Sequence, residues 1–168
     1  TYGLKQGLPS ERMYAVYMDK NKIIWAGTAQ GLVRIENNRV QSFGEADGLP
    51  AGAVYSILAA PEGGLYLGTH RGLFLGRNGK FERITKDFPD EAVISLTLDS
   101  ESNLWLGTVN RGVLRFGRRG LESLDAKAGM PNNRVGALFS DREGNVWAGT
   151  NAGLVRFADT PFVTYDNY

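Results

Sequence analysis

One motif occurs four times in the sequence at nearly constant spacing. It consists of an aromatic residue, an apolar residue, Gly-Thr, a variable gap of two or three residues, and then Gly followed by an aliphatic residue. The Gly-Thr pairs begin at Gly27, Gly68, Gly107 and Gly149, so successive copies lie 41, 39 and 42 residues apart. A repeat of this length indicates a chain built from similar structural units, each of which buries its apolar face against the next.

Each repeat divides into short segments that are predicted to be strands. The first is a nearly continuous apolar run, at residues 13–18, 53–60, 92–98 and 135–139. The second carries the aromatic-Gly-Thr sequence, at residues 23–28, 65–69, 104–108 and 146–150, and the third follows the gap, at residues 32–35, 73–75, 113–116 and 154–157. Short runs of this kind in the first segment predict strands that are buried on both faces. No segment keeps a helical apolar period, so we predict no helix.

A fourth segment of each repeat holds two apolar residues among charged ones. The pairs are Val40 with Phe43, Phe81 with Ile84, Leu121 with Leu124, and Phe162 with Tyr165. Such a half-solvated strand suits the edge of a sheet. The gradient from an apolar first strand to a charged fourth strand predicts an all-β chain that forms a β-propeller, with four-stranded antiparallel blades numbered outward from the axis. We expect one domain over residues 1–168, with blades at about 10–43, 51–85, 90–125 and 132–165.

A proline-containing element separates the repeats. It is Gly-Leu-Pro at residues 7–9 and 48–50, Asp-Phe-Pro at residues 87–89, and Gly-Met-Pro at residues 129–131. Because proline has no N–H to donate to a sheet, this element is predicted to connect the outer strand of one blade to the inner strand of the next.

The complete order of these elements resembles the two-component regulator propeller repeat. Residues 129–157 carry it most fully, with Asp141, Gly144 and Asn145 before the Trp-x-Gly-Thr sequence and Gly-Leu-x-Arg after it. The resemblance implies the sensor region of a bacterial hybrid histidine kinase, or a region that precedes a diguanylate cyclase. It therefore implies signal transduction and a periplasmic, extracytoplasmic location. It also implies rings of seven blades, followed by a membrane helix and a signalling module.

Four blades are fewer than such a ring contains. An open ring would expose the apolar faces of its terminal blades, so we expect this propeller to be part of a larger ring or to be completed by a second copy of the chain. The sequence begins at Thr1 without the features of a signal peptide, and we expect it to be a piece of a longer protein. No apolar run is long enough to span a bilayer, so we expect no direct membrane insertion of this segment.

Composition excludes several classes of function. The net charge of +1 creates no field that would attract nucleic acid. The absence of cysteine excludes thiolate zinc sites and cysteine nucleophiles, and the single histidine, His70, cannot form a histidine metal cluster. The glycines open no helix, so they do not form a phosphate-binding loop. Instead, glycine beside threonine suggests tight packing between blades, and glycine after the gap suggests a turn with positive φ. We predict no metal, no cofactor and no catalytic residue.

Three aspartates, Asp19, Asp99 and Asp141, each stand six residues before a blade tryptophan. The spacing allows two interpretations: a hairpin turn in which the carboxylate accepts backbone N–H bonds, and a calcium loop or glycosidase acid. The turn is favoured, because aspartate and glycine prefer such turns and the second repeat lacks the aspartate. The tryptophans are predicted to fill the core between blades rather than to stack on a sugar.

The residues that vary between repeats are the candidate ligand-binding residues. In a propeller the gap turn and the connection between blades open on one face, and variation on a fixed scaffold is typical of binding sites. The candidates are Gln30, His70, Arg71, Asn110, Arg111 and Asn151 from the gaps, and Arg12, Asn133 and Arg134 from the connections. Their amide, imidazole and guanidinium groups suit a polar or anionic small molecule, such as an oligosaccharide. For His70, an exposed loop position and a ligand contact remain equally open.

These observations predict a non-catalytic, ligand-binding sensor propeller. Two alternatives stay open. One is a propeller enzyme, either a lyase like the streptogramin-inactivating propellers or a glycosidase. The other is a structural module that binds a protein through its exposed blade faces.

Overall fold

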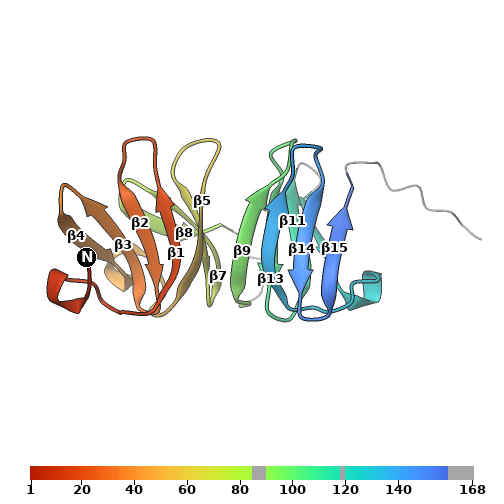
Figure 1. The fold of residues 1–168 in the computed structure, drawn as a ribbon, viewed down its shortest axis with the longest axis horizontal. Coiled ribbons are helices and arrows are strands. Elements are labelled where there is room, and N and C mark those ends of the chain that lie inside the picture. The colour runs from red at the N-terminus through yellow and green to blue at the C-terminus, as the bar shows by residue number, and fades with distance from the viewer. Residues whose placement is uncertain (85–89, 118–119, 159–168) are drawn as a thin grey trace, which may run out of the picture.

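A computed structural model of the chain, shown in Figure 1, describes residues 1–84, 90–117 and 120–158. Four antiparallel sheets lie side by side as an arc, and in each sheet the strands are neighbours in the order in which they follow one another in the sequence. The first and last sheets occupy the two ends of the arc. The prediction of an all-β propeller with four antiparallel blades is confirmed.

The strands of each blade follow the repeat. Blade 1 contains β1 (Met13–Met18), β2 (Ile24–Thr28), β3 (Gly31–Glu36) and β4 (Arg39–Phe43). Blade 2 contains β5 (Val54–Ala59), β6 (Leu65–Thr69), β7 (Gly72–Arg77) and β8 (Lys80–Arg83). Blade 3 contains β9 (Val93–Leu98), β10 (Leu104–Thr108), β11 (Val113–Gly117) and β12 (Gly120–Leu124). Blade 4 contains β13 (Val135–Ser140), β14 (Val146–Thr150) and β15 (Gly153–Phe157). The strand expected around Phe162 and Tyr165 lies outside the described residues.

The core consists of apolar clusters between consecutive blades. Leu32 of β3 packs with Val54 of β5, Leu73 of β7 packs with Val93 of β9, and Val113 of β11 packs with Val135 of β13. All six side chains are buried. Burying a side chain of this size stabilises the fold by about 1.5–3 kcal/mol, so the inner strands of blades 2, 3 and 4 are each held by the blade before them.

Glycine in the Gly-Thr pair allows this close approach. A Cβ atom on Gly27 would lie 2.4 Å from the carbonyl oxygen of Val54, in the next blade. The corresponding distances are 2.6 Å from Gly68 to Val93 and 2.8 Å from Gly107 to Val135. The predicted role of this glycine in blade packing is therefore confirmed at these three junctions.

The burial of the inner strands differs from the prediction. We expected β1, β5, β9 and β13 to be buried on both faces, yet most residues of these strands are half-buried or exposed. The second strands are more buried, and every residue of β10 is buried. β5 and β9 each contact an inner strand on both sides and are mostly half-buried, whereas β1 and β13 belong to the two end blades and carry the exposed residues.

Three short 3₁₀ helices correct the prediction of no helix. They span Leu4–Gln6, Glu45–Asp47 and Ala126–Ala128, and they are too short to carry an apolar period. Each ends at the glycine of the connecting element, with φ of 94° at Gly7, 94° at Gly48 and 92° at Gly129. Because this left-handed conformation is easily reached only by glycine, the 3₁₀ turn explains the glycine that precedes Leu-Pro or Met-Pro.

Candidate functional site

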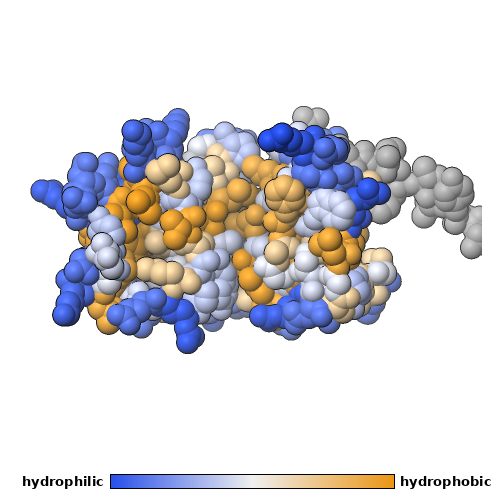
Figure 2. Space-filling view, in the orientation of Figure 1, coloured by the Kyte–Doolittle hydropathy of each residue, from blue (hydrophilic) through white to orange (hydrophobic). Residues whose placement is uncertain are grey.

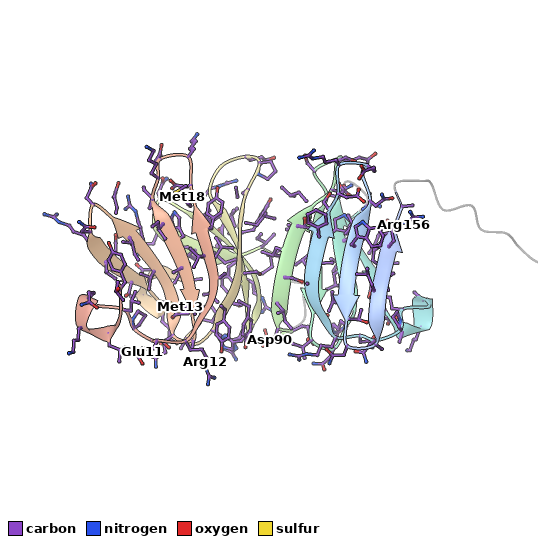
Figure 3. The ribbon with its side chains drawn as sticks, viewed as in Figure 1. Glu11, Arg12, Met13, Met18, Asp90 and Arg156 are labelled. Carbon is purple, nitrogen blue, oxygen red and sulfur yellow. The ribbon has the colours of Figure 1, made fainter. Side chains whose placement is uncertain are left out.

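The gap turns and the connections between blades lie at the same end of every blade, as predicted. The amide of Ala29 donates to the carbonyl of Arg12 at 3.0 Å, and the amide of His70 donates to Ala53 at 3.1 Å. Figure 3 shows this lower end, where Arg12 and Asp90 lie, opposite the end at which Met18 lies. The loops at the lower end therefore form one continuous rim along the blades.

A threonine hydroxyl closes each gap turn. In blade 3, Oγ1 of Thr108 donates to the carbonyl of Gly112 at 2.8 Å and accepts from the amide of Arg111 at 2.9 Å. The other three threonines make the same pair of bonds. The glycine after each gap has a positive φ, which confirms the prediction for that position. The hydroxyl thus fixes the shape of the turn, while the residues of the gap remain free to vary.

A hollow of about 480 Å³ opens at this rim between blades 3 and 4. It is lined by Val109, Asn110, Ala126, Pro131, Asn132, Asn133 and Arg134. Three of the nine predicted residues, Asn110, Asn133 and Arg134, are therefore brought together. The backbone amide of Gly112 donates to the carbonyl of Asn133 at 2.8 Å, which ties the gap turn of blade 3 to the connection that leads into blade 4.

Hydrogen bonds inside the loops determine which polar groups face the hollow. Oε1 of Glu91 accepts from the backbone amide of Asn110 at 3.0 Å and from its Nδ2 at 3.3 Å. Oδ1 of Asn133 accepts from the amide of Ala126, and Oδ1 of Asn132 accepts from the amide of Arg134, both at 2.7 Å. The side-chain oxygens of Asn132 and Asn133 are thus used within the protein. Their Nδ2 groups and the Arg134 guanidinium have no partner among the described residues and remain available as donors.

The other predicted residues do not line this hollow. Arg12, Gln30, Arg71, Arg111 and Asn151 are exposed on the same rim. His70 is half-buried, with Cε1 2.8 Å from the position of a Cβ on Gly52, and its Nδ1 is buried without a hydrogen-bond partner. Of the two interpretations of His70, the structure therefore does not support a freely exposed loop side chain.

Two residues of the site were not selected from the sequence. Glu91 is only 9% exposed and positions Asn110 from another loop, and Asn132 shapes the backbone at Arg134. The pairing of Glu91 with Asn110 joins residues 19 positions apart, and no spacing rule indicates it. For Asn132, the sequence feature that could have indicated its role was the polar run Asn132-Asn133-Arg134.

A second hollow of about 460 Å³ lies on the outer strands of blade 1. It is lined by Arg34, Glu36, Asn37, Arg39 and Gln41. Arg34 forms an ion pair with Glu36, and its Nε is buried without a hydrogen-bond partner. The lining is charged and belongs to the sheet edge, so it matches the solvated fourth strand that the sequence predicts.

The three aspartates form the predicted turns at the other end of the blades. Oδ1 of Asp99 accepts from the amides of Glu101 at 3.0 Å and Asn103 at 2.8 Å, and Oδ2 accepts from Nε1 of Trp105 at 2.8 Å. Asp19 and Asp141 likewise accept from the backbone of their own turn and from Trp25 and Trp147. The turn interpretation is confirmed. No group of three His, Asp or Glu side chains in residues 1–84, 90–117 and 120–158 is arranged to hold a metal ion.

These hydrogen bonds also shift the pKa of two carboxyls. Burial by itself would raise the pKa of Asp99, but the hydrogen bonds from Trp105 and Asn103 and the charge of Arg115 outweigh it, so the pKa lies below its ordinary value. The pKa of Asp141 is lowered chiefly by the hydrogen bond from Trp147. Both carboxylates are therefore ionised at neutral pH, which does not suit a general acid.

The tryptophans fill the space between strands and between blades. Trp105 is 6% exposed, and its ring lies 5.2 Å from the ring of Phe157 in blade 4. Trp25 stacks on Phe43 at 5.8 Å within the cluster between blades 1 and 2. The predicted core role is confirmed for these two residues.

Comparison with protein families gives a match along the repeat. The model of the two component regulator propeller family matches residues 7–30, 87–110 and 129–152. Each matched segment runs from a connection through the inner strand to the gap turn. No curated protein matches the sequence.

Several solved structures share the fold. The extracellular domain of a one component system from B. thetaiotaomicron is 26% identical with a TM-score of 0.78, and the match covers 89% of this chain and 22% of that one. A catalytically inactive virginiamycin B lyase from Staphylococcus aureus, crystallised with quinupristin, is 16% identical with a TM-score of 0.66. This match covers 90% of this chain and 57% of the lyase. The computationally designed protein Ika4 is 14% identical with a TM-score of 0.65, and the match covers 90% of this chain and 93% of Ika4. The chain thus spans about a fifth of the length of the extracellular domain. Within the described ranges no helix is long and apolar enough to cross a membrane.

Proposed function

This chain is built from two-component regulator propeller repeats, and on that premise we propose that it is a non-catalytic, extracytoplasmic sensor that binds a small polar ligand in the hollow between blades 3 and 4. The similarity of this chain to extracellular domains of one-component and hybrid two-component systems from B. thetaiotaomicron supports a role in signal transduction. The observation that carries the ligand-binding proposal is the set of unpaired donors around the hollow.

The chemistry of the hollow favours a ligand rich in hydrogen-bond acceptors. Asn132 and Asn133 use their side-chain oxygens within the protein and keep their Nδ2 groups, and Arg134 adds a guanidinium. Val109, Ala126 and Pro131 supply apolar surface beside these donors. Such a mixture suits the hydroxyl, ring and carboxylate oxygens of an acidic oligosaccharide, whose C–H faces can rest on apolar side chains. A volume of about 480 Å³ lies in the usual range for small-molecule sites.

The same lining argues against an enzyme. Its side chains are aliphatic, amide and guanidinium groups, which are poor proton carriers at neutral pH. The nearby Glu91 carboxylate is held by two hydrogen bonds from Asn110. The likeness to a lyase, at 16% identity, concerns the fold alone.

A ligand in this position would touch two blades at once. Asn110 belongs to the gap turn of blade 3, whereas Asn133 and Arg134 lead into blade 4. A ligand can shift an equilibrium only if it binds one arrangement better than the other. Contacts from both blades would make the affinity depend on how the two blades pack, and this is the property that a sensor requires.

The proposal is tested by thermal unfolding with a panel of neutral and acidic oligosaccharides, followed by titration calorimetry of any that stabilise the chain. A ligand at 100 times its Kd stabilises a protein by about 2.7 kcal/mol. We expect Arg134→Ala to weaken binding roughly 10- to 100-fold, because a hydrogen bond to a charged group contributes about 1.5–3 kcal/mol. Arg12→Ala is the matched control, since Arg12 is exposed on the same rim but does not line the hollow.

Each result of this test has a defined meaning. Binding that Arg134→Ala weakens and Arg12→Ala leaves unchanged supports the proposal. Binding that both variants leave unchanged places the ligand elsewhere and contradicts it. Turnover of the sugar would support the enzyme alternative, and the absence of any response to the panel would favour the protein-interaction module.

A further inference from the structure

The two ends of the arc expose blade faces whose counterparts are buried elsewhere in the same chain. The leading face consists of Met13, Val16 and Met18 on β1, and the trailing face consists of Phe139, Gly149 and Leu154 on blade 4. Figure 2 shows apolar side chains across the middle of this side of the molecule, between hydrophilic upper and lower rims. Both faces are therefore apolar surfaces that the described residues leave uncovered.

On the trailing face, Leu154 takes the register position opposite the Gly-Thr glycine. Leu154 is 66% exposed, while Leu32, Leu73 and Val113 in the same position of the other blades are 0%, 2% and 0% exposed. Phe139 is 64% exposed beside it. The difference arises because a following blade covers the other three positions.

On the leading face, Met13 takes the register position opposite the threonine of the Gly-Thr pair. Met13 is 38% exposed, whereas Val54, Val93 and Val135 in the same position are at most 1% exposed. Val16 and Met18 on the same strand are 72% and 63% exposed. No blade precedes β1 in the described residues to cover these side chains.

The internal junctions indicate what fits the trailing face. At each of them, the valine carbonyl of the following inner strand fills the space beside the Gly-Thr glycine, within 2.4–2.8 Å of a Cβ position. At Gly149 that space is open, and the nearest atom is the Cβ of Ala137 at 3.7 Å. Met13 takes the same register position as the valines whose carbonyls fill this space at the internal junctions. A leading face like that of this chain therefore fits the open space on the trailing face.

We propose that a second copy of this chain covers both faces, so that the trailing face of each copy packs on the leading face of the other. Figure 1 shows blades 1 and 4 toward the viewer at the two ends of the arc, so both faces are presented on one side and a single partner can meet them together. A two-fold axis then generates both junctions. Wherever a residue of the first copy contacts a residue of the second, the same two positions also meet with the copies exchanged. The product is a ring of eight blades, which lies within the range that propellers form. This inference does not depend on ligand binding in the rim hollow.

The test is the molar mass of the 168-residue chain in solution, measured by light scattering over a range of concentrations. We expect a dimer. The variants Val16→Glu and Leu154→Glu should give folded monomers, because each places a charge on one face only. Leu121→Glu is the matched control, because Leu121 is 41% exposed on the outer strand β12, away from both faces. It should remain a dimer.

Two further variants test the geometry of the junction. Gly149→Ala adds a Cβ that meets nothing closer than 3.7 Å in the single chain, so it should fold normally and yet lose the dimer. Because the chain has no cysteine, the double variant Met13→Cys and Leu154→Cys should form a disulfide between copies under mild oxidation, whereas either single variant should not. A monomeric wild-type chain would overturn the proposal. So would a polymer that grows with concentration, or a dimer that Gly149→Ala and Leu154→Glu leave intact.

Discussion

Nε1 of Trp105 donates a hydrogen bond of 2.8 Å to Oδ2 of Asp99, across the hairpin that joins β9 to β10. The guanidinium carbon of Arg115 lies 5.3 Å from the centre of the Trp105 ring, and its Nη2 lies 3.5 Å from the same carboxylate oxygen. Blades 1 and 4 repeat the hydrogen bond from tryptophan to aspartate and the placement of arginine over the tryptophan ring, with Asp19, Trp25 and Arg34, and with Asp141, Trp147 and Arg156. In blade 2 these positions hold Ala60, Tyr66 and Leu75. The three residues are therefore present together or absent together.

Removal of this carboxylate should destabilise the chain. Asp99→Ala leaves the indole N–H of Trp105 and the amide of Asn103 without an acceptor, and both residues are less than 9% exposed. A buried donor left unpaired costs about 1–3 kcal/mol. We expect a loss of that size in the free energy of unfolding, measured with urea. Glu62→Ala, an exposed carboxylate in the turn of blade 2, is the control and should change stability by less than about 0.5 kcal/mol. Equal effects of the two variants would contradict the proposed role of Asp99.

The lowered pKa of Asp99 predicts a loss of stability in acid. A carboxyl whose pKa is lower in the folded than in the unfolded chain stabilises the fold above its unfolded value, here 3.8, and this contribution disappears as the pH falls through the folded pKa. We expect the difference in unfolding free energy between the wild type and Asp99→Asn to be constant near neutral pH and to shrink below pH 3.8. Unfolding measured at several pH values tests this, and a difference that stays constant down to pH 2 would contradict it.

The fold was predictable because the residues that recur in every repeat are required by the local geometry of the chain. Gly27 permits the approach of Val54, and Gly31 takes a positive φ, so each follows from the steric properties of glycine. The burial of the inner strands was not predictable, since an apolar run does not reveal whether a neighbouring blade is present. Val16 and Ile57 occupy equivalent positions, yet only Ile57 packs into a cluster between blades.

The candidate site was predictable only in part. Variation within a repeating frame pointed to Asn110, Asn133 and Arg134, which line the hollow. The same rule also selected Gln30 and Asn151, which do not, because the repeat pattern indicates the end of a blade but not where the loops of two blades form a hollow. The role of Glu91 depends on a contact between two loops, which only the folded chain brings together.

The glycine at a junction between blades should tolerate no side chain. In Gly27→Ala the new Cβ would lie 2.4 Å from the backbone oxygen of Val54, so blades 1 and 2 must separate slightly. Overpacking of a core typically costs about 1–3 kcal/mol. Gly136→Ala is the matched control, because its Cβ meets no atom within 4 Å, and it should be neutral or stabilising by about 0.4–1 kcal/mol. Thermal unfolding of both variants checks the prediction, and a stable Gly27→Ala would show that the blades can separate at little cost.

The hydroxyl of Thr108 should contribute more to stability than its methyl group. Thr108→Val keeps the shape of the side chain but leaves the carbonyl of Gly112 and the amide of Arg111 without the hydroxyl that joins them, and residue 108 is fully buried. We expect a loss of about 1–3 kcal/mol in the free energy of unfolding by urea, because unpaired buried polar groups are costly. Thr108→Ser keeps the hydroxyl and loses only the methyl, so it should be the more stable variant of the two. If Thr108→Val is as stable as Thr108→Ser, packing rather than hydrogen bonding explains the threonine, and the gap turn does not depend on this hydroxyl for its shape.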